Sequence, residues 1–211
     1  MTQPATPIVF YGFALSGHSH RVELFLKLLD LPYQAVWVDL AKGEQKAPDY
    51  VARHPFGQVP MIDDGGTVLW DSSAILVYLA SKYDDGRWLP NDPVGRAEVQ
   101  RWLSVAAGQL AAGPAAARVC VIFKRGGDLD AMQEGAHRLF ATMDAFLGAH
   151  DYLAAGRPTI ADLAMYAYTA HAPEGGVDLA LYPNIGAWIS RLEALPRFYT
   201  MVRSEAGLWA A

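Results

Sequence analysis

Strand-like sequence patterns stop near residue 83, and this change along the chain limits its fold more than any other feature. Before that point, short apolar runs alternate with patterns typical of amphipathic helices. After it, the strand patterns are replaced by helical periodicity: residues 94–123 and 128–150 are long and rich in alanine, 159–172 is apolar nearly all round, and 185–195 is a shorter helix. We therefore predict an α/β domain over residues 1–83, a linker rich in Asp, Gly and Pro over 84–93, and an all-helical domain over 94–211.

The first eighty residues predict the element order βαβ, then α, then ββα. Residues 8–13 are typical of a buried strand, and a broad apolar helical face follows from His20 until Pro32 ends it. A second strand over residues 33–40 should be parallel to the first, because a helix connects them. The remaining predicted elements are a short polar helix over 42–53, a hairpin of strands 59–62 and 67–70 around Asp63–Gly66, and a helix over 72–83.

This order is that of a thioredoxin-like domain, in which a ligand would bind at the carboxyl end of the first strand. A thioredoxin carries Cys-x-x-Cys at the start of its first helix, where this chain has Ser16-Gly17-His18-Ser19. A hydroxyl cannot exchange disulfides, so dithiol chemistry is excluded at this position. A helix N-terminus with a serine hydroxyl can instead stabilise the thiolate of a bound molecule.

The composition excludes several other classes of protein. With 17 Lys+Arg against 22 Asp+Glu, the net charge is -5, which leaves no basic face for nucleic acid. The single cysteine, Cys120, cannot form an internal disulfide and favours a reducing compartment, and no Cys and His cluster has the spacing of a metal site. Without a secretion signal or an apolar run of about 18 residues, we expect a cytoplasmic protein with no membrane span.

Three motifs occur in order along the chain. Residues 54–60 read His-Pro-Phe-Gly-Gln-Val-Pro and precede Asp-Ser-Ser-Ala-Ile at 71–75, while residues 159–162 read Thr-Ile-Ala-Asp. The opening segment 11–40 has a compatible spacing. The chain thereby resembles the cytosolic glutathione S-transferases of the serine type over almost its whole length. The resemblance implies a homodimer that joins glutathione to a hydrophobic electrophile, a reaction of detoxification.

The resemblance also implies a set of glutathione-binding residues. A cis bond before Pro60 would turn the backbone of Val59 outward, so that the tripeptide could pair with it as an added strand. The side chain of Gln58 would contact the ligand backbone and Lys46 the glycyl carboxylate, unless either is simply a solvated surface residue.

Asp71 and Ser72 stand where the family binds the γ-glutamyl end of glutathione. The resemblance implies that Ser72 holds the carboxylate and that Asp71 helps to bind the amino group. Both residues are also favoured at helix N-termini, so capping and binding are compatible here.

The residue that activates the thiol is open between three candidates. Spacing within the resemblance favours Ser16, with Ser19 as the alternative and Tyr11 as a poor match to the tyrosine-type classes. Lowering a thiol pKa by about 2 units requires roughly 2.7 kcal/mol, which a charge-assisted hydrogen bond and a helix N-terminus can largely supply.

Other residues are expected to shape the second domain. The electrophile would bind between the domains against Leu15, Trp102 and Leu110. Thr159 and Asp162 match a capping box, in which the threonine caps the helix and the carboxylate reaches back, and we expect a structural role for both.

Two alternatives to a transferase remain open from the sequence. Glutathione could be a returning cofactor, as in the family's isomerases, dehalogenases and peroxidases. The chain could also be a non-catalytic binding or scaffold protein, although an intact tripeptide-binding block at residues 58–60 and 71–72 argues against this alternative.

Overall fold

The computed structural model describes residues 2–210, which form two compact units. The first unit extends to Leu89 and also contains Pro196–Met201, while the second contains Pro90–Leu195 and the chain from Val202 on. This division falls within the expected linker. The segment Pro196–Met201 departs from the expected domains, because it packs with the first unit although it lies near the far end of the chain.

The first unit is built around a four-stranded sheet. Its strands lie in the order β2-β1-β3-β4, where β1 and β2 are parallel and the other two pairings are antiparallel. This arrangement confirms the predicted thioredoxin-like fold. The elements of the unit are β1 (Ile8–Gly12), α1 (Gly17–Leu28), β2 (Tyr33–Trp37), η1 (Glu44–Lys46), α2 (Pro48–Val51), β3 (Met61–Asp64), β4 (Thr67–Trp70) and α3 (Ser72–Tyr83).

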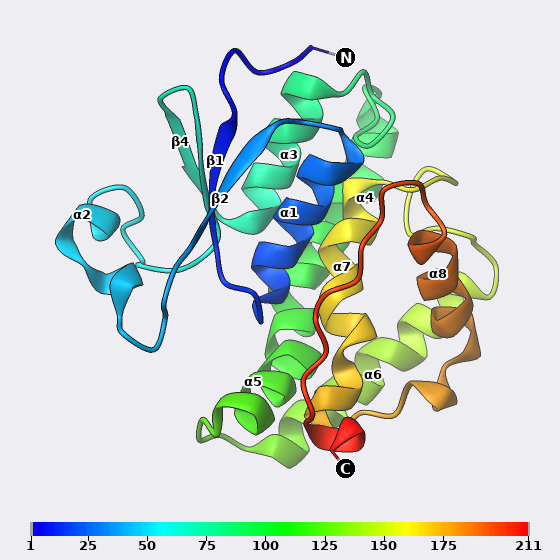
Figure 1. Ribbon diagram of the computed structural model, residues 1–211. Coiled ribbons are helices and arrows are strands. Elements are labelled where there is room, and N and C mark those ends of the chain that lie inside the picture. Colours follow the sequence, from blue (N-terminus) through cyan, green and yellow to red (C-terminus); the bar gives the residue numbers. More distant parts are fainter. Residues whose placement is uncertain (1, 211) are drawn as a thin grey trace. The chain divides into compact units, whose positions relative to one another are not determined.

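Helices α1 and α3 lie on one side of the sheet and α2 lies on the other (Figure 1). Tyr11 of β1 points to the α2 side, where its ring meets Tyr50 edge-on with 6.2 Å between the ring centroids. Because side chains alternate along a strand, Ile8 and Phe10 point to the opposite face, and both are fully buried. The main core of this unit therefore lies between the sheet and helices α1 and α3.

Two turns of the first unit show how local sequence sets its shape. Gly65 and Gly66 join β3 to β4 with φ of 60° and 94°, the conformation that a tight hairpin requires. The single helix expected over residues 42–53 is instead divided into η1 and α2, because Pro48 has no N–H and begins a new helix at its first position.

The segment Pro196–Met201 is held to α1 by polar contacts within the same unit. The Tyr199 hydroxyl donates to the Glu23 carboxylate at 2.6 Å, and Nζ of Lys27 lies 3.7 Å from the centroid of the Tyr199 ring. Burial and the bond to Glu23 raise the pKa of Tyr199 above its usual range. These contacts join residues that are far apart in the sequence, so periodicity could not predict them.

The second unit is helical, as predicted. Gly113 packs so closely on α6 that an added Cβ would lie 2.9 Å from the backbone nitrogen of Ala136. The helix around it widens into a π-helical stretch that contains Pro114, whose missing N–H removes one hydrogen bond from an α-helix. The elements are α4 (Pro93–Val105), η2 (Ala106–Ala115), α5 (Ala116–Phe123), α6 (Leu129–Leu147), α7 (Ile160–Ala170), η3 (Ala172–Gly175), η4 (Leu179–Leu181), α8 (Pro183–Glu193) and η5 (Gly207–Trp209).

The helical stretch Pro93–Phe123 has the length of a membrane span and a mean hydropathy of 1.4 over 18 residues. This finding differs from the expectation that no segment of the chain is long and apolar enough. Core helices of globular domains also reach such values. Here the stretch packs against α6 and α7, with Val99 and Leu110 almost completely buried, so we interpret it as a core helix.

Two carboxylates form closed polar centres inside the helical unit. Asp162 accepts hydrogen bonds from the Thr159 N–H and hydroxyl, the Leu153 N–H and the Trp188 indole, at 2.8 to 3.0 Å. Thr159 also accepts from the Ala161 N–H, which completes the capping box at the start of α7. Asp162 is fully buried, and all four of these hydrogen-bond donors belong to the chain itself.

The second closed centre is Glu174 in η3. Its carboxylate accepts from Arg118 and from the Ser204 N–H at 2.8 Å, and it lies 3.0 Å from Nδ1 of His171. Burial opposes ionisation of Glu174, but these hydrogen bonds and the neighbouring positive charge lower its pKa to about 2. The centre therefore ties residues beyond Val202 to the helices of the same unit.

Candidate functional site

A pocket of about 270 Å³ opens in the first unit at the N-terminus of α3. Its size is close to the lower end for sites that bind small molecules. It combines a helix N-terminus with polar and aromatic walls. The lining residues are His18, His54, Phe56, Gln58, Val59, Pro60, Trp70, Asp71 and Ser72.

Helix α3 begins at Asp71 and Ser72, the acidic residue and the hydroxyl residue that were predicted from the sequence to bind a ligand. Asp71 is its N-cap, and its carboxylate accepts from the Ala74 N–H at 2.9 Å. The N–H groups of Ser72 and Ser73 belong to the first turn, where a helix offers them no acceptor of its own. Asp71 has φ of 70°, an uncommon value for a residue other than glycine. The start of α3 thus presents N–H groups and a hydroxyl to the pocket, which suits an anion.

The Ser72 hydroxyl is buried and lies between two nitrogen atoms from α1. Nδ1 of His18 lies 3.2 Å from its oxygen, and Nη1 of Arg21 donates to the same oxygen at 3.2 Å. Burial, together with the positive charge of Arg21, lowers the pKa of His18 to about 3, so its imidazole is neutral at pH 7. Ser72 is therefore fixed by contacts to a second helix.

The three candidates for thiol activation occupy different positions. Ser16 is half-buried as the N-cap of α1 and accepts from the Ser19 N–H at 3.2 Å, while its proton has no acceptor among residues 2–210. Ser19 is buried, and its oxygen accepts from the Phe13 N–H. The Tyr11 hydroxyl accepts from Arg53 at 2.8 Å on the α2 side of the sheet. Ser16 thus retains a donor at a helix N-terminus.

The edge of the pocket includes a backbone segment, residues 58–60, that belongs to no helix or strand. The Val59–Pro60 peptide bond is cis, and the Tyr50 hydroxyl holds the Gln58 carbonyl at 2.7 Å. No hydrogen bond joins the N–H or C=O of Val59 to any other described residue. The exposed Gln58 side chain lines the same pocket. A peptide could therefore pair with Val59 in the manner of an added strand.

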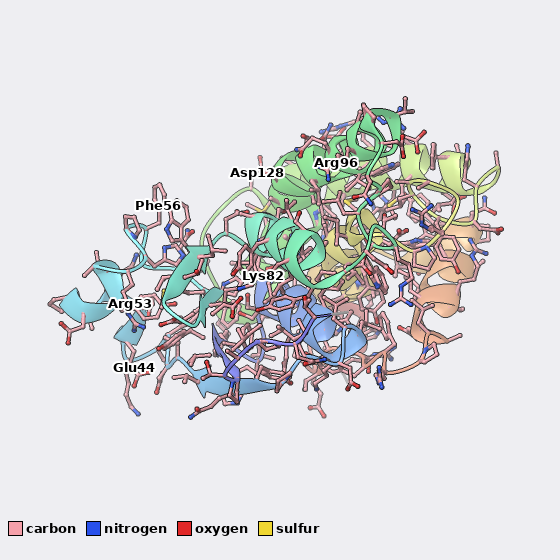
Figure 2. All side chains as sticks on the ribbon, turned by 90° about the horizontal axis from the view of Figure 1, so that it is seen from above. Glu44, Arg53, Phe56, Lys82, Arg96 and Asp128 are labelled. Atoms are coloured by element: carbon pink, nitrogen blue, oxygen red, sulfur yellow. The ribbon has the colours of Figure 1, made fainter. Side chains whose placement is uncertain are left out.

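Aromatic rings form the other wall. His54 is almost fully buried and stacks on Trp70 with 5.2 Å between ring centroids, and its ring is also stacked with that of Tyr50 at 6.1 Å. Burial lowers the pKa of His54. Phe56 meets Trp70 edge-on, yet 62% of its surface is exposed, and it projects from the chain between α2 and β3 (Figure 2).

Lys46 lies outside the group of residues that line the pocket. Its Nζ donates to the Phe56 carbonyl at 2.9 Å. Gly57, with φ of 54°, lets this approach occur, since a Cβ there would lie 2.6 Å from the Gln45 carbonyl oxygen. In this structure Lys46 supports the loop that carries the aromatic wall.

The residues expected to hold the electrophile are spread over both units. Leu15 is half-buried in the turn before Ser16. Trp102 lines a second cavity, of about 460 Å³, between α4, η2 and α6 of the helical unit. Leu110 has no exposed surface and packs in the core of its unit, so it offers no contact area to a substrate.

Sequence reasoning missed a role for Arg21, His54 and Trp70. Arg21 interrupts the apolar face of α1, and a charge in such a position is the one signal that could have marked it. His54 and Trp70 act through their stacking, which no local pattern reveals. Within residues 2–210 no group of three His, Cys, Asp or Glu side chains could hold a metal ion.

Comparison with known families identifies the family of the chain. Residues 15–82 match the model described as glutathione S-transferase, N-terminal domain, and residues 101–196 match glutathione S-transferase, C-terminal domain. The chain belongs to the glutathione S-transferase family. Its members are transferases, so the predicted enzyme class is confirmed at this level.

Individual relatives agree with this family membership over most of the chain. Glutathione S-transferase 3 from Zea mays is 33% identical over 207 residues, 93% of each protein. A glutathione S-transferase structure from Pseudomonas fluorescens has a TM-score of 0.88 and 32% identity, and covers 94% of this chain and 100% of that one. The structure of a glutathione transferase homologue from Drosophila mojavensis, solved with bound glutathione, has a TM-score of 0.82 and 31% identity. It covers 90% of this chain and 89% of that one.

Proposed function

We propose that this family member is a glutathione transferase that activates the glutathione thiol as a thiolate. The observation that carries the proposal is the pocket in which the N-terminus of α3 at Ser72 adjoins the unpaired backbone of Val59. An anion suits the first feature and an extended peptide suits the second. Glutathione has both, since its γ-glutamyl end carries a carboxylate and its cysteine lies in a peptide.

Glutathione would bind with its cysteine backbone paired to Val59 and its γ-glutamyl carboxylate at Ser72. Asp71 has one carboxylate oxygen on the Ala74 N–H, and its other oxygen can attract the ligand's ammonium group. Gln58 would contact the ligand backbone. Lys46 contributes a positive charge beside the same loop and would attract the glycyl carboxylate.

The thiol would be activated by Ser16. Its hydroxyl donates to the sulfur, and the N-terminus of α1 adds a favourable potential, so that the thiol proton leaves to solvent. The thiolate then attacks an electrophilic carbon of a hydrophobic substrate. A carbon–sulfur bond forms, and the leaving group departs with its bonding electron pair. Leu15, next to Ser16, would provide an apolar contact for that substrate.

The physiological setting is part of the proposal. Conjugation of hydrophobic electrophiles would serve detoxification. The free thiol of Cys120 suits the reducing cytoplasm, where unpaired cysteines persist. A homodimer would pack the first unit of each copy on the helical unit of the other, and sedimentation should then give twice the mass of the chain.

The test is the replacement of Ser16 by alanine, with Ser19→Ala as the matched control. With an aryl halide as electrophile, Ser16→Ala should lower kcat about 100-fold and return the pKa of bound glutathione, read from thiolate absorbance, to near 8.5. Ser19→Ala should retain the low thiol pKa. Undiminished turnover in Ser16→Ala would contradict the assignment. Mass spectrometry of the products decides between a conjugate and regenerated glutathione.

A further inference from the structure

The Ser72 hydroxyl has two nitrogen neighbours, and together they use two of its three ways to form a hydrogen bond. A serine hydroxyl has one proton and two lone pairs. Arg21 uses one lone pair, because a guanidinium can only donate. The contact to Nδ1 of His18 uses either the second lone pair or the proton, and the direction of this contact decides what Ser72 offers to the pocket.

The two directions have opposite consequences for an anion. If Ser72 donates to a bare Nδ1, its proton is consumed and the pocket meets a hydroxyl oxygen, which repels a carboxylate. If Nδ1 carries the proton and donates to Ser72, both lone pairs are used and the hydroxyl proton points to the remaining partner. Only the second direction lets Ser72 donate to a bound carboxylate.

We propose that His18 is a positioning residue that carries its proton on Nδ1 when glutathione is bound, so that Ser72 donates its hydroxyl proton to the γ-glutamyl carboxylate. This inference rests on the proposed function of the pocket. The ring of His18 itself lines that pocket, and Arg21 is almost fully buried beside it. A neutral imidazole can place its single proton on either nitrogen, so the site can adopt this arrangement without gaining a charge.

The direct test is the proton position of His18 in the wild-type protein. With nitrogen-15-labelled histidine, nuclear magnetic resonance distinguishes a protonated Nδ1 from a bare one. Addition of S-methylglutathione, which binds without a free thiol, should give the signal of a neutral ring with the proton on Nδ1. A complex in which His18 carries its only proton on Nε2 would overturn the inference.

A double-mutant cycle tests whether His18 acts through Ser72. Measured by calorimetry with S-methylglutathione, Ser72→Ala should raise Kd about 10-fold and His18→Leu about 5-fold or more. His18→Asn should lie within about 2-fold of the wild type, because the asparagine amide can donate from a similar position. In the Ser72→Ala background, His18→Leu should have almost no further effect.

Different results would show that the inference about His18 is wrong and that the proposed function is wrong. Additive effects of His18→Leu and Ser72→Ala, with the wild type binding normally, would overturn the inference alone. A wild-type protein that does not bind S-methylglutathione at millimolar concentration would overturn the proposed function and the inference with it. Circular dichroism of each variant establishes that the compared proteins are folded.

Discussion

The hydroxyl of Ser72 in the first unit and the carboxylate of Asp162 in the helical unit have similar surroundings but differ in whether the chain supplies all of their hydrogen-bond partners. Each lies at the start of a helix, where an oxygen atom gathers N–H donors. Asp162 receives all four of its hydrogen bonds from the chain itself. Ser72 receives two contacts from α1, and its remaining side faces a pocket.

The difference indicates when such a centre is structural and when it can bind a ligand. A buried polar group must find partners, and the chain supplies all of them at Asp162 and at Glu174. At Ser72 it supplies part of them and leaves space of about 270 Å³ beside an unpaired stretch of backbone. A buried polar group whose hydrogen-bond partners all come from the chain contributes to stability. A group with some partners missing can bind a ligand that supplies the rest.

The largest effect expected from this comparison is a loss of stability when Asp162 is replaced. Asp162→Ala should lower the free energy of unfolding by about 4 kcal/mol, because four buried donors lose their acceptor together. Asp128→Ala is the matched control, since this N-cap of α6 is exposed and, among residues 2–210, its carboxylate accepts from the Ala131 N–H alone (Figure 2). Its loss should cost about 1 kcal/mol. Urea denaturation measures both, and equal losses would break the comparison.

An intermediate effect is expected from acid. Because the folded pKa of Glu174 is about 2, below its ordinary value of 4.5, its contribution to stability is complete above about pH 4.5 and is lost as pH falls toward 2. The contribution is on the order of 3 kcal/mol. The gap in unfolding free energy between wild type and Glu174→Gln should therefore narrow with falling pH. A gap that stays constant from neutral pH to pH 3 would contradict the assignment.

The smallest expected effect distinguishes the capping role of Asp71 from its role in binding the ligand. Asp71→Asn should change the unfolding free energy by less than about 0.5 kcal/mol, because asparagine caps helices well and tolerates a positive φ. Affinity for glutathione should fall about 2- to 5-fold, since the attraction to the ligand's ammonium group is lost.

Asp92→Asn provides the control for this measurement. Asp92 caps α4 through the Gly95 N–H at 2.8 Å and has no place in the pocket, so calorimetry should show unchanged affinity for glutathione. If Asp71→Asn also left the affinity unchanged, Asp71 would be a cap and nothing more.

Local signals were sufficient for the framework of this site. The helix over residues 72–83 was predicted with the bounds that the structure has, and the hairpin at Gly65 and Gly66 followed from its turn residues. The first helix begins at Gly17, earlier than its apolar pattern at His20, because Ser16 caps a first turn that carries polar residues. Apolar periodicity cannot mark this first turn, because its residues are small or polar although Gly17, Ser19 and His20 are buried.

The sequence by itself determined the order of strands and helices, the residues that begin α3 and α7, and the family to which the chain belongs. Only the tertiary structure decided that Arg21 and His18 meet Ser72, that His54 stacks on Trp70, and that residues 196–201 join the first unit. The reason is the range of the forces involved. Capping and periodicity act within a few residues, whereas a hydroxyl's partners from another helix are set by the packing of the whole unit.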